Sequence, residues 1–163
     1  PQAQAAESPP PDPAALPGPL LPRAFRFLAF GDMGAGSAHQ KDIARLMGAM
    51  RQRTPYSLVL LLGDNLYPNG NVKLFGKRNF TDVYDPMLAQ GVVFKAALGN
   101  HDVLTGHGEP VMAMTGMPSR YYRFRQGPVD FFAIDSNDFD GAQAAWLERA
   151  LLQSKGPWRV VFG

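Results

Sequence analysis

Short runs of apolar residues alternate along the chain with segments of helical periodicity. Three of these runs, Phe25–Phe30, Leu58–Leu62 and Val92–Leu98, are rich in the residues that favour strands. The middle run consists of five consecutive Leu and Val residues, which is typical of a strand buried on both faces of a covered parallel sheet. We therefore expect these strands to form the centre of the fold.

Three other segments carry apolar residues at helical spacing: Gln40–Met50, Asn79–Ala89 and Gly141–Gln153. Ser37 is the expected N-cap of the first, because its hydroxyl can accept a hydrogen bond from a backbone N–H of the first turn. The glycines that precede Ser37 match neither a dinucleotide-binding fingerprint nor a P-loop. The periodicity thus predicts three helices without a nucleotide-binding motif.

The second half of the chain adds strands of a different kind. Basic and aromatic residues alternate over Ser119–Arg125, which predicts an antiparallel strand with a basic face. A turn at Gln126–Pro128 pairs this strand with the apolar run that ends at Asp135, and a last strand begins near Trp158. The order of elements predicts a layered α/β sandwich with a mixed, largely parallel sheet.

The first 22 residues differ in composition from the rest. They hold eight of the 15 prolines, among Ala, Gln and Ser, and few large apolar residues. Such a segment cannot bury enough surface to order itself, so residues 1–22 are predicted to be a linker or tail and 23–163 one folded domain. A Pro/Ala spacer after a removed signal peptide is our hypothesis for this segment, which predicts an exported protein, periplasmic or secreted.

Charge and composition exclude several classes of protein. Sixteen basic and 14 acidic side chains leave a net charge of +2, and this even balance argues against nucleic acid as the main partner. No apolar run reaches 18 residues, so no transmembrane segment is predicted. The chain has no cysteine, which excludes disulfides and Cys-ligated zinc. The sequence gives no signal for an oligomeric state.

Polar side chains follow each of the three central strands. They are Asp32 after the first, Asp64 and Tyr67 after the second, and Asn100, His101 and Asp102 after the third. Taken singly, such an Asp has a plain alternative as a turn residue that caps the next element. Because parallel strands end at one edge of a sheet, we expect these donors to converge there. Together they suit a two-metal site, in which one carboxylate bridges cations about 3.5–4 Å apart. Asp102 is expected to orient the His101 imidazole, which would act on a substrate phosphate.

These three segments resemble the first three signature blocks of calcineurin-like metallophosphoesterases. The blocks are Gly31-Asp32-Met33-Gly34, Gly63-Asp64-Asn65-Leu66-Tyr67 and Gly99-Asn100-His101-Asp102. In most of that superfamily a histidine stands where this chain has Gly34. The glycine, together with Tyr67, is similar to the purple acid phosphatase pattern, in which a tyrosine phenolate binds ferric iron. A phenolate is a hard anionic donor, which suits that ion.

The resemblance implies a dinuclear centre of Fe(III) with a divalent metal, Fe, Zn or Mn. It implies that Asp32 and Tyr67 hold the ferric ion, that Asp64 bridges, and that Asn100 holds the second metal. His101 would act on the phosphate of a small phosphate-ester substrate. The implied activity is that of an acid phosphatase-like hydrolase, either a phosphomonoesterase or a phosphodiesterase.

The family continues with two further blocks that supply three histidine ligands. Residues 161–163 look like the start of the fourth block, and the sequence stops one residue before its histidine. We therefore expect a domain truncated in its C-terminal half and weak or absent hydrolysis by this chain alone. The alternative is a non-catalytic fragment that binds metal or phosphate, or that has a structural role.

Other polar residues are expected to be secondary. His107 and Glu109 are expected in a solvated loop, although they lie just beyond the third block. Asp135 also follows an apolar strand, and we expect it to cap the next element or to support the site rather than to bind metal. The arginines Arg120, Arg123 and Arg125 are expected on a solvated face.

Overall fold

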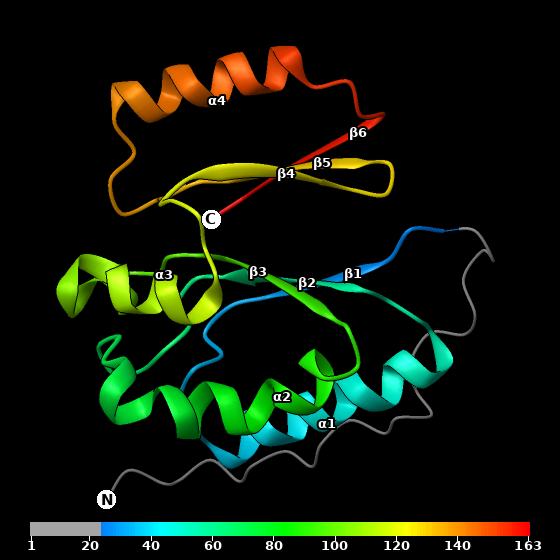
Figure 1. Cartoon of the computed structure of the whole chain (residues 1–163), viewed down its shortest axis with the longest axis vertical. Helices are drawn as coiled ribbons and strands as arrows, with labels where there is room; N and C mark the ends of the chain where they lie inside the picture. The colour runs from blue at the N-terminus through cyan, green and yellow to red at the C-terminus, as the bar shows by residue number, and fades with distance from the viewer. Residues whose placement is uncertain (1–23) are drawn as a thin grey trace, which may run out of the picture.

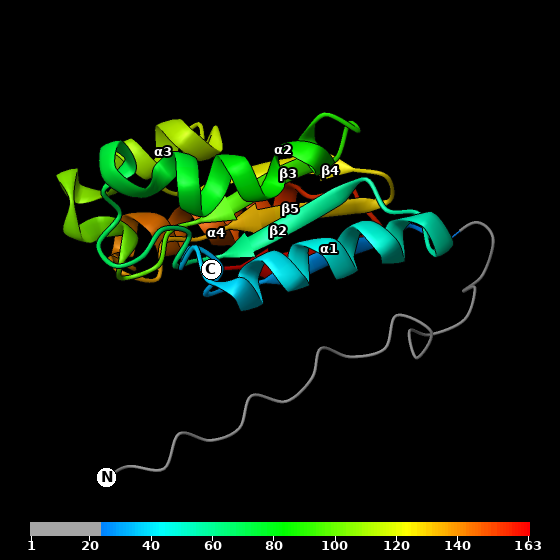
Figure 2. The ribbon, with the colours of Figure 1, turned by 90° about the horizontal axis from the view of Figure 1, so that it is seen from below.

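The computed structural model describes residues 24–163, so the predicted tail at 1–22 lies outside the described residues. These residues form four layers (Figure 1): helices α1 (Ala38–Arg53) and α2 (Asp82–Leu88) cover one face of a first three-stranded sheet, as the view from below also shows (Figure 2). A second three-stranded sheet lies on the other face of the first, and helix α4 (Gly141–Gln153) covers the outer face of the second sheet. The predicted layered α/β sandwich is confirmed, and its strands divide between two sheets.

The first sheet contains the three strands predicted for the centre of the fold. β1 (Phe27–Phe30), β2 (Leu58–Leu62) and β3 (Val93–Ala97) are parallel and lie in the order β1-β2-β3. Leu58–Leu61 are at most 1% exposed, which confirms a strand buried on both faces. All three strands therefore end at the same edge of the sheet.

The second sheet combines the predicted hairpin with the last strand. β4 (Tyr122–Gln126) pairs antiparallel with β5 (Val129–Ala133), and β6 (Trp158–Phe162) pairs parallel with β5. The Tyr122 hydroxyl donates to the Ala96 carbonyl on β3 at 2.7 Å, which ties the two sheets together. Aromatic rings fill the space between them, with Phe27 and Phe131 edge to face at 5.2 Å.

The helices agree with the periodicity except in the middle of the chain. Ser37 caps α1 by accepting a hydrogen bond from the Gln40 N–H, and α4 has the predicted bounds. The predicted helix at 79–89 is instead a π-helix, Val72–Thr81, followed by α2. The π-helix begins early because the Asn71 side chain accepts the Leu74 N–H, a polar cap that apolar spacing does not reveal.

The segment after the third strand is more helical than the sequence suggested. Short 3-10 turns cover Asp102–Leu104 and Gly106–Gly108, and α3 spans Glu109–Thr115 with a proline in its first turn. The Gly-rich stretch before α3 hid this helix from a periodicity argument. Within residues 24–163, none of the helices has the length and apolar character required to cross a membrane.

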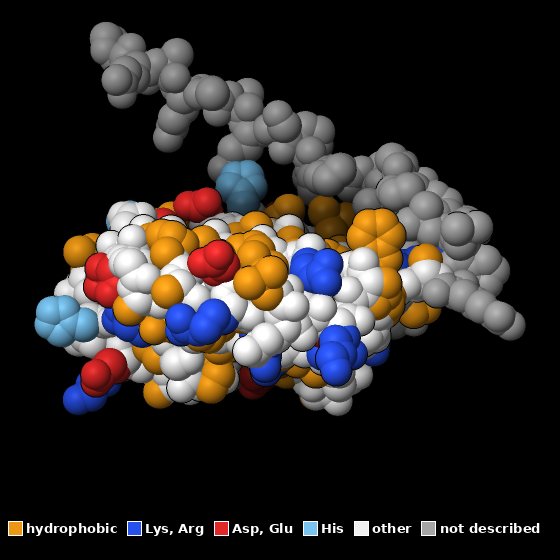
Figure 3. Space-filling model, turned by 90° about the horizontal axis from the view of Figure 1, so that it is seen from above, with side chains coloured by type: hydrophobic (Ala, Val, Ile, Leu, Met, Phe, Trp, Pro, Cys, Tyr) orange, Lys and Arg blue, Asp and Glu red, His pale blue; other side chains and the backbone are white. Residues whose placement is uncertain are grey.

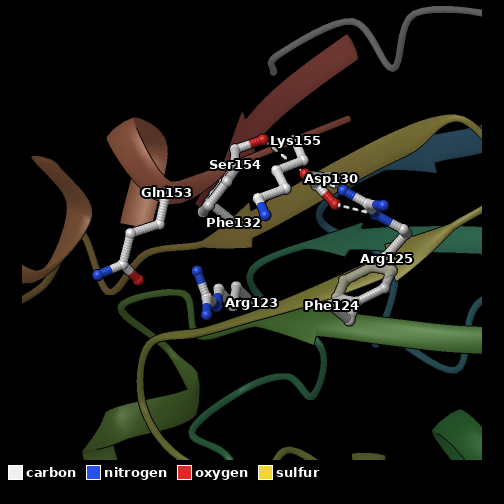
Figure 4. A pocket seen from close by; sticks show the side chains of 8 residues that line it. All are labelled: Arg123, Phe124, Arg125, Asp130, Phe132, Gln153, Ser154 and Lys155. Carbon is white, nitrogen blue, oxygen red and sulfur yellow. Dashed lines mark hydrogen bonds and ion pairs between the residues drawn. The ribbon is translucent and has the colours of Figure 1, made fainter. Parts of the chain in front are cut away.

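Asp130 on β5 fixes the turn between α4 and β6. Its carboxylate accepts two bonds from the Arg125 guanidinium, at 2.6 and 2.8 Å (Figure 4). It also accepts bonds from the Ser154 hydroxyl and the Gly156 N–H. The guanidinium, followed by the Ser154 hydroxyl, holds the pKa of Asp130 well below its usual range. Arg125 is therefore paired, not merely part of a solvated basic face.

Asp130, Arg125 and Ser154 are among the residues that line a hollow of about 340 Å³. None of the predicted metal-binding residues lines this hollow. Seen from the side of α4, basic, acidic and apolar side chains are interspersed over the surface (Figure 3). No single sign of charge dominates this face, in agreement with the small net charge of the chain.

Candidate metal centre

Three loops at the carboxyl ends of β1, β2 and β3 carry the residues predicted for the site. We call 31–37 the first loop, 63–71 the second loop and 98–101 the third loop. Asp32 and Asp64, one in each of the first two loops, have φ of 56° and 52°. This left-handed region is sparsely populated by residues other than glycine, and such conformations cluster at functional sites.

The Tyr67 hydroxyl joins the first two loops. Its oxygen lies 2.6 Å from Asp32 Oδ1 and 2.6 Å from Asp64 Oδ2. A phenol carries a single hydrogen and can donate to only one of the two carboxylates at a time. The other close oxygen–oxygen contact therefore has no hydrogen bond from the phenol. We call Asp32, Asp64 and Tyr67 the oxygen cluster.

The electrostatics of the oxygen cluster favour a cation. Hydrogen bonds to Asp32 and Asp64 raise the pKa of the Tyr67 phenol well above its usual range. A cation at the same point would favour the phenolate instead, because nearby positive charge stabilises the anionic form. Carboxylate and phenol oxygens are hard donors, so the residues present fit a hard cation such as ferric iron.

Asn100 faces the same hollow as the two carboxylates. This hollow, of about 320 Å³, is lined by Asp32, Leu62, Gly63, Asp64, Leu98, Gly99, Asn100, Ser136, Asn137 and Gly163. The structure thus brings the third loop to the oxygen cluster. It also adds Ser136 and Asn137, which the sequence analysis did not single out. Their position directly after Asp135, at the end of an apolar strand, is the signal in the sequence that points to them.

His101 lies against the oxygen cluster. Its backbone N–H donates to Asp64 Oδ1 at 3.1 Å, and its ring packs on Tyr67 with the centroids 4.4 Å apart. Nδ1 lies 2.6 Å from the Pro68 carbonyl oxygen. A carbonyl can only accept, so Nδ1 carries the hydrogen and Nε2 is left for other chemistry.

The prediction that Asp102 orients His101 is wrong. The Asp102 side chain is fully buried and accepts four N–H bonds from the second and third loops. The donors are Asn65 N, Asn65 Nδ2, Leu66 N and Gly99 N, at 2.7–3.0 Å. Burial raises the pKa of the Asp102 carboxyl, while these N–H groups oppose the rise. Asp102 therefore fastens the two loops to each other, and Pro68 holds the imidazole.

Two glycines allow the loops to approach this closely. A Cβ on Gly34 would lie 2.0 Å from the Asn65 carbonyl oxygen, and one on Gly99 would lie 2.1 Å from Asp64 N. Both contacts are with backbone, which cannot swing aside. Any side chain at either position would therefore separate the loops that carry the donors.

Asp135 supports the hollow from outside it. Its carboxylate, 2% exposed, accepts from Arg120 Nε at 2.6 Å and from the Asn137 N–H at 3.0 Å. Arg120 also donates to the His107 carbonyl, and Asn137 donates to the Leu98 carbonyl in the third loop. Asp135 thus links the second sheet to the hollow, which is the supporting position expected for it.

Histidine, cysteine and acidic residues do not form a metal-binding group of three or more anywhere in 24–163. The donors gathered here are two carboxylates, a phenol and an amide. The His101 imidazole lies beside these oxygen donors.

Comparison with known proteins agrees with this geometry. Residues 25–163 match the family model of the calcineurin-like phosphoesterases. Tartrate-resistant acid phosphatase type 5 of Oryctolagus cuniculus is 28% identical over 180 residues, which cover 85% of this chain and 55% of that protein. Purple acid phosphatase 17 of Arabidopsis thaliana is 27% identical over 175 residues, which cover 84% of this chain and 50% of that protein. The chain thus spans about half the length of these relatives.

A solved structure shows the same fold. Purple acid phosphatase PPD1 from yellow lupin (Lupinus luteus) seeds superposes with a TM-score of 0.68 at 20% identity, covering 84% of this chain and 29% of that one. The likeness supports the layered arrangement of the two sheets.

Proposed function

Because the chain belongs to the calcineurin-like phosphoesterase family, we propose that it is part of a hydrolase that cleaves phosphate esters at a dinuclear metal centre of the purple acid phosphatase type. The observation that carries this proposal is the oxygen cluster, with the Tyr67 hydroxyl 2.6 Å from both Asp32 and Asp64. A centre of this kind gathers anionic oxygens that would otherwise repel one another.

In this proposal Asp32 and Tyr67 would hold ferric iron, Asn100 would hold a divalent ion (Fe, Zn or Mn), and Asp64 would be a ligand shared by the two ions. A bound pair of cations supplies charge neutralisation to the phosphate and lowers the pKa of a water nucleophile. The chain itself contributes the spacing of these donors, which the buried Asp102 and the close contact at Gly99 keep fixed.

His101 is proposed to act on the substrate. Its Nδ1 hydrogen is committed to the Pro68 carbonyl, so Nε2 is the atom that can hold or release a proton toward the phosphate or the leaving oxygen. Packing against Tyr67 and the backbone bond to Asp64 hold the ring beside the cluster. A fixed imidazole at this point would stabilise negative charge that develops on the ester.

The remaining ligands are proposed to lie in a continuation of the chain. Gly163 lines the same hollow as Asp32, Asp64 and Asn100. A residue after Gly163 in a longer chain would therefore enter at the site. This placement supports the proposal that the next block supplies a histidine ligand.

The ferric assignment is tested by absorption spectroscopy of the iron-loaded parent protein. We expect a purple tyrosinate-to-ferric charge-transfer band that Tyr67→Phe abolishes. Tyr56→Phe is the matched control, since it removes a phenol at the opposite end of β2. An iron-loaded Tyr67→Phe protein with an unchanged spectrum would show that Tyr67 is not a ligand.

Hydrolysis is tested with a generic aryl phosphate. Asp64→Ala and Asn100→Ala should abolish turnover in the longer parent protein. The chain of 163 residues should be much less active than the parent. Equal activity of the two would refute the proposed need for additional histidines.

The second candidate function is that of a binding module without turnover. It is favoured by the donor set, which within 24–163 contains no group of three histidine, cysteine or acidic residues. Metal or phosphate binding by the chain without hydrolysis by the longer parent would support this candidate over the enzyme.

Export is also proposed, from the Pro/Ala-rich composition of 1–22. The natural precursor should then begin with a cleaved signal peptide. A precursor without such a signal, retained in the cytoplasm on cell fractionation, would refute export.

A further inference from the structure

We propose that Asn79 is a positioning residue that holds the first and second loops together, so that Asp32 and Tyr67 meet. The inference rests on the proposed metal centre for its functional consequence. Asn79 lies near the end of the π-helix Val72–Thr81, outside all the segments that the sequence singled out as candidate ligands. Its side chain touches neither carboxylate of the oxygen cluster.

The contacts of Asn79 are with backbone groups of both loops. Its Nδ2 donates to the Gly34 carbonyl at 3.0 Å and to the Tyr67 carbonyl at 3.3 Å. The Gly34 carbonyl also accepts the Tyr67 backbone N–H at 3.0 Å. One amide group therefore joins the two loops directly beside the contact that they make with each other.

Asn79 is itself fixed on several sides. The residue is 1% exposed, and its Oδ1 accepts from Arg78 Nε at 2.8 Å. Its backbone carbonyl accepts from Gln40 Nε2 at 2.5 Å, and the Gln40 Oε1 accepts the Gly36 N–H at 2.5 Å. Gln40 lies in the first turn of α1, so Gln40 and Asn79 together anchor the first loop to α1 and to the π-helix.

The first loop and the Asn79 side chain are closely packed. A Cβ on Gly36 would lie 2.2 Å from Asn79 Oδ1, so the first loop lies directly on the Asn79 amide. Buried carbonyls need donors, and the Gly34 carbonyl has the Asn79 amide as one of its two. Removing that donor should let the loops separate. Because π-helical turns are rare and frequently occur at functional sites, the setting of Asn79 agrees with such a role.

Asn79→Asp tests the donor without changing the shape of the side chain. The new carboxylate keeps an acceptor for Arg78 but places oxygen against two carbonyl oxygens. Asn79→Ala removes the group altogether and serves if the Asp variant does not fold. Tyr56→Phe is the matched control, because it deletes a buried hydrogen bond to the Met47 carbonyl at the other end of β2.

Two measurements on the chain in its full natural length decide the proposal. The first is amide hydrogen exchange at the Tyr67 N–H in metal-free protein, which we expect to be at least tenfold faster in both Asn79 variants. The second is titration with Mn²⁺ alone, for which the dissociation constant should rise at least tenfold. Tyr56→Phe should change neither, at a comparable loss of global stability.

Unchanged exchange at the Tyr67 amide would overturn the proposal. Faster exchange with unchanged Mn²⁺ affinity would also overturn it, since Asn79 would then fasten backbone without positioning ligands. If the unaltered protein binds no Mn²⁺, the proposed metal centre fails. The exchange rates of the Asn79 variants then decide by themselves whether the contact between the loops stands.

Discussion

Replacing Gly99 with alanine tests whether the close approach of the second and third loops builds the site. A Cβ at this position would lie 2.1 Å from Asp64 N, whereas ordinary contact begins at 3.4 Å. The Asp64 backbone would therefore have to move by about 1.3 Å, the difference between these two distances. Gly99 has no positive φ, so alanine introduces no backbone strain of its own and the effect isolates the contact.

The expected consequences are separate for stability and for the site. Overpacking of this kind costs about 1–3 kcal/mol, measured as a lower free energy of unfolding in urea. A displacement of about 1 Å in a positioned group can cost about 100-fold in rate, so hydrolysis by the parent protein should fall to about 1%.

Gly48→Ala is the matched control for this substitution. Gly48 lies within α1, and a Cβ there would meet nothing within 4 Å. The same added methyl group should stabilise the protein by about 0.5–1 kcal/mol, because alanine favours a helix interior over glycine. If Gly99→Ala were as stable and as active as Gly48→Ala, the close approach would not build the site.

Three further substitutions probe the buried acids. Arg125 keeps the pKa of Asp130 below its unfolded value, so this pair stabilises the fold above about pH 4, and the contribution is lost as the pH falls toward the folded pKa. Asp130→Asn should therefore make the melting temperature depend less on pH between about pH 5 and 2. The same decrease in melting temperature with falling pH in the variant and in the unaltered protein would contradict this. Asp135→Asn removes the charged partner of the half-exposed Arg120 and should cost about 1–2 kcal/mol in urea denaturation, whereas a change below 0.5 kcal/mol, on the order of a neutral surface substitution, would argue against a supporting role. Asp102→Asn turns an NH2 toward N–H donors and should cost about 2–3 kcal/mol with loss of activity, while lost activity at full stability would instead indicate a direct part in catalysis.

Much of the fold follows from local pattern. The run Leu58–Leu62 specified a strand buried on both faces, and Gly141–Gln153 specified a helix with its bounds, because the periods of buried side chains differ between strand and helix. The order of elements predicted the layers. The π-helix was missed because it begins at a polar cap, the Asn71 side chain, which apolar spacing does not reveal.

The chain by itself determined which donors stand at strand ends. Parallel strands share an edge, so Asp32, Asp64 and Asn100 had to approach one another once the strands were known. The sequence could not determine which backbone groups each polar side chain would find. Only the tertiary structure turned Asp102 toward the second loop and placed Asn79 between two carbonyls, because a buried polar group binds whatever partner the packed loops present.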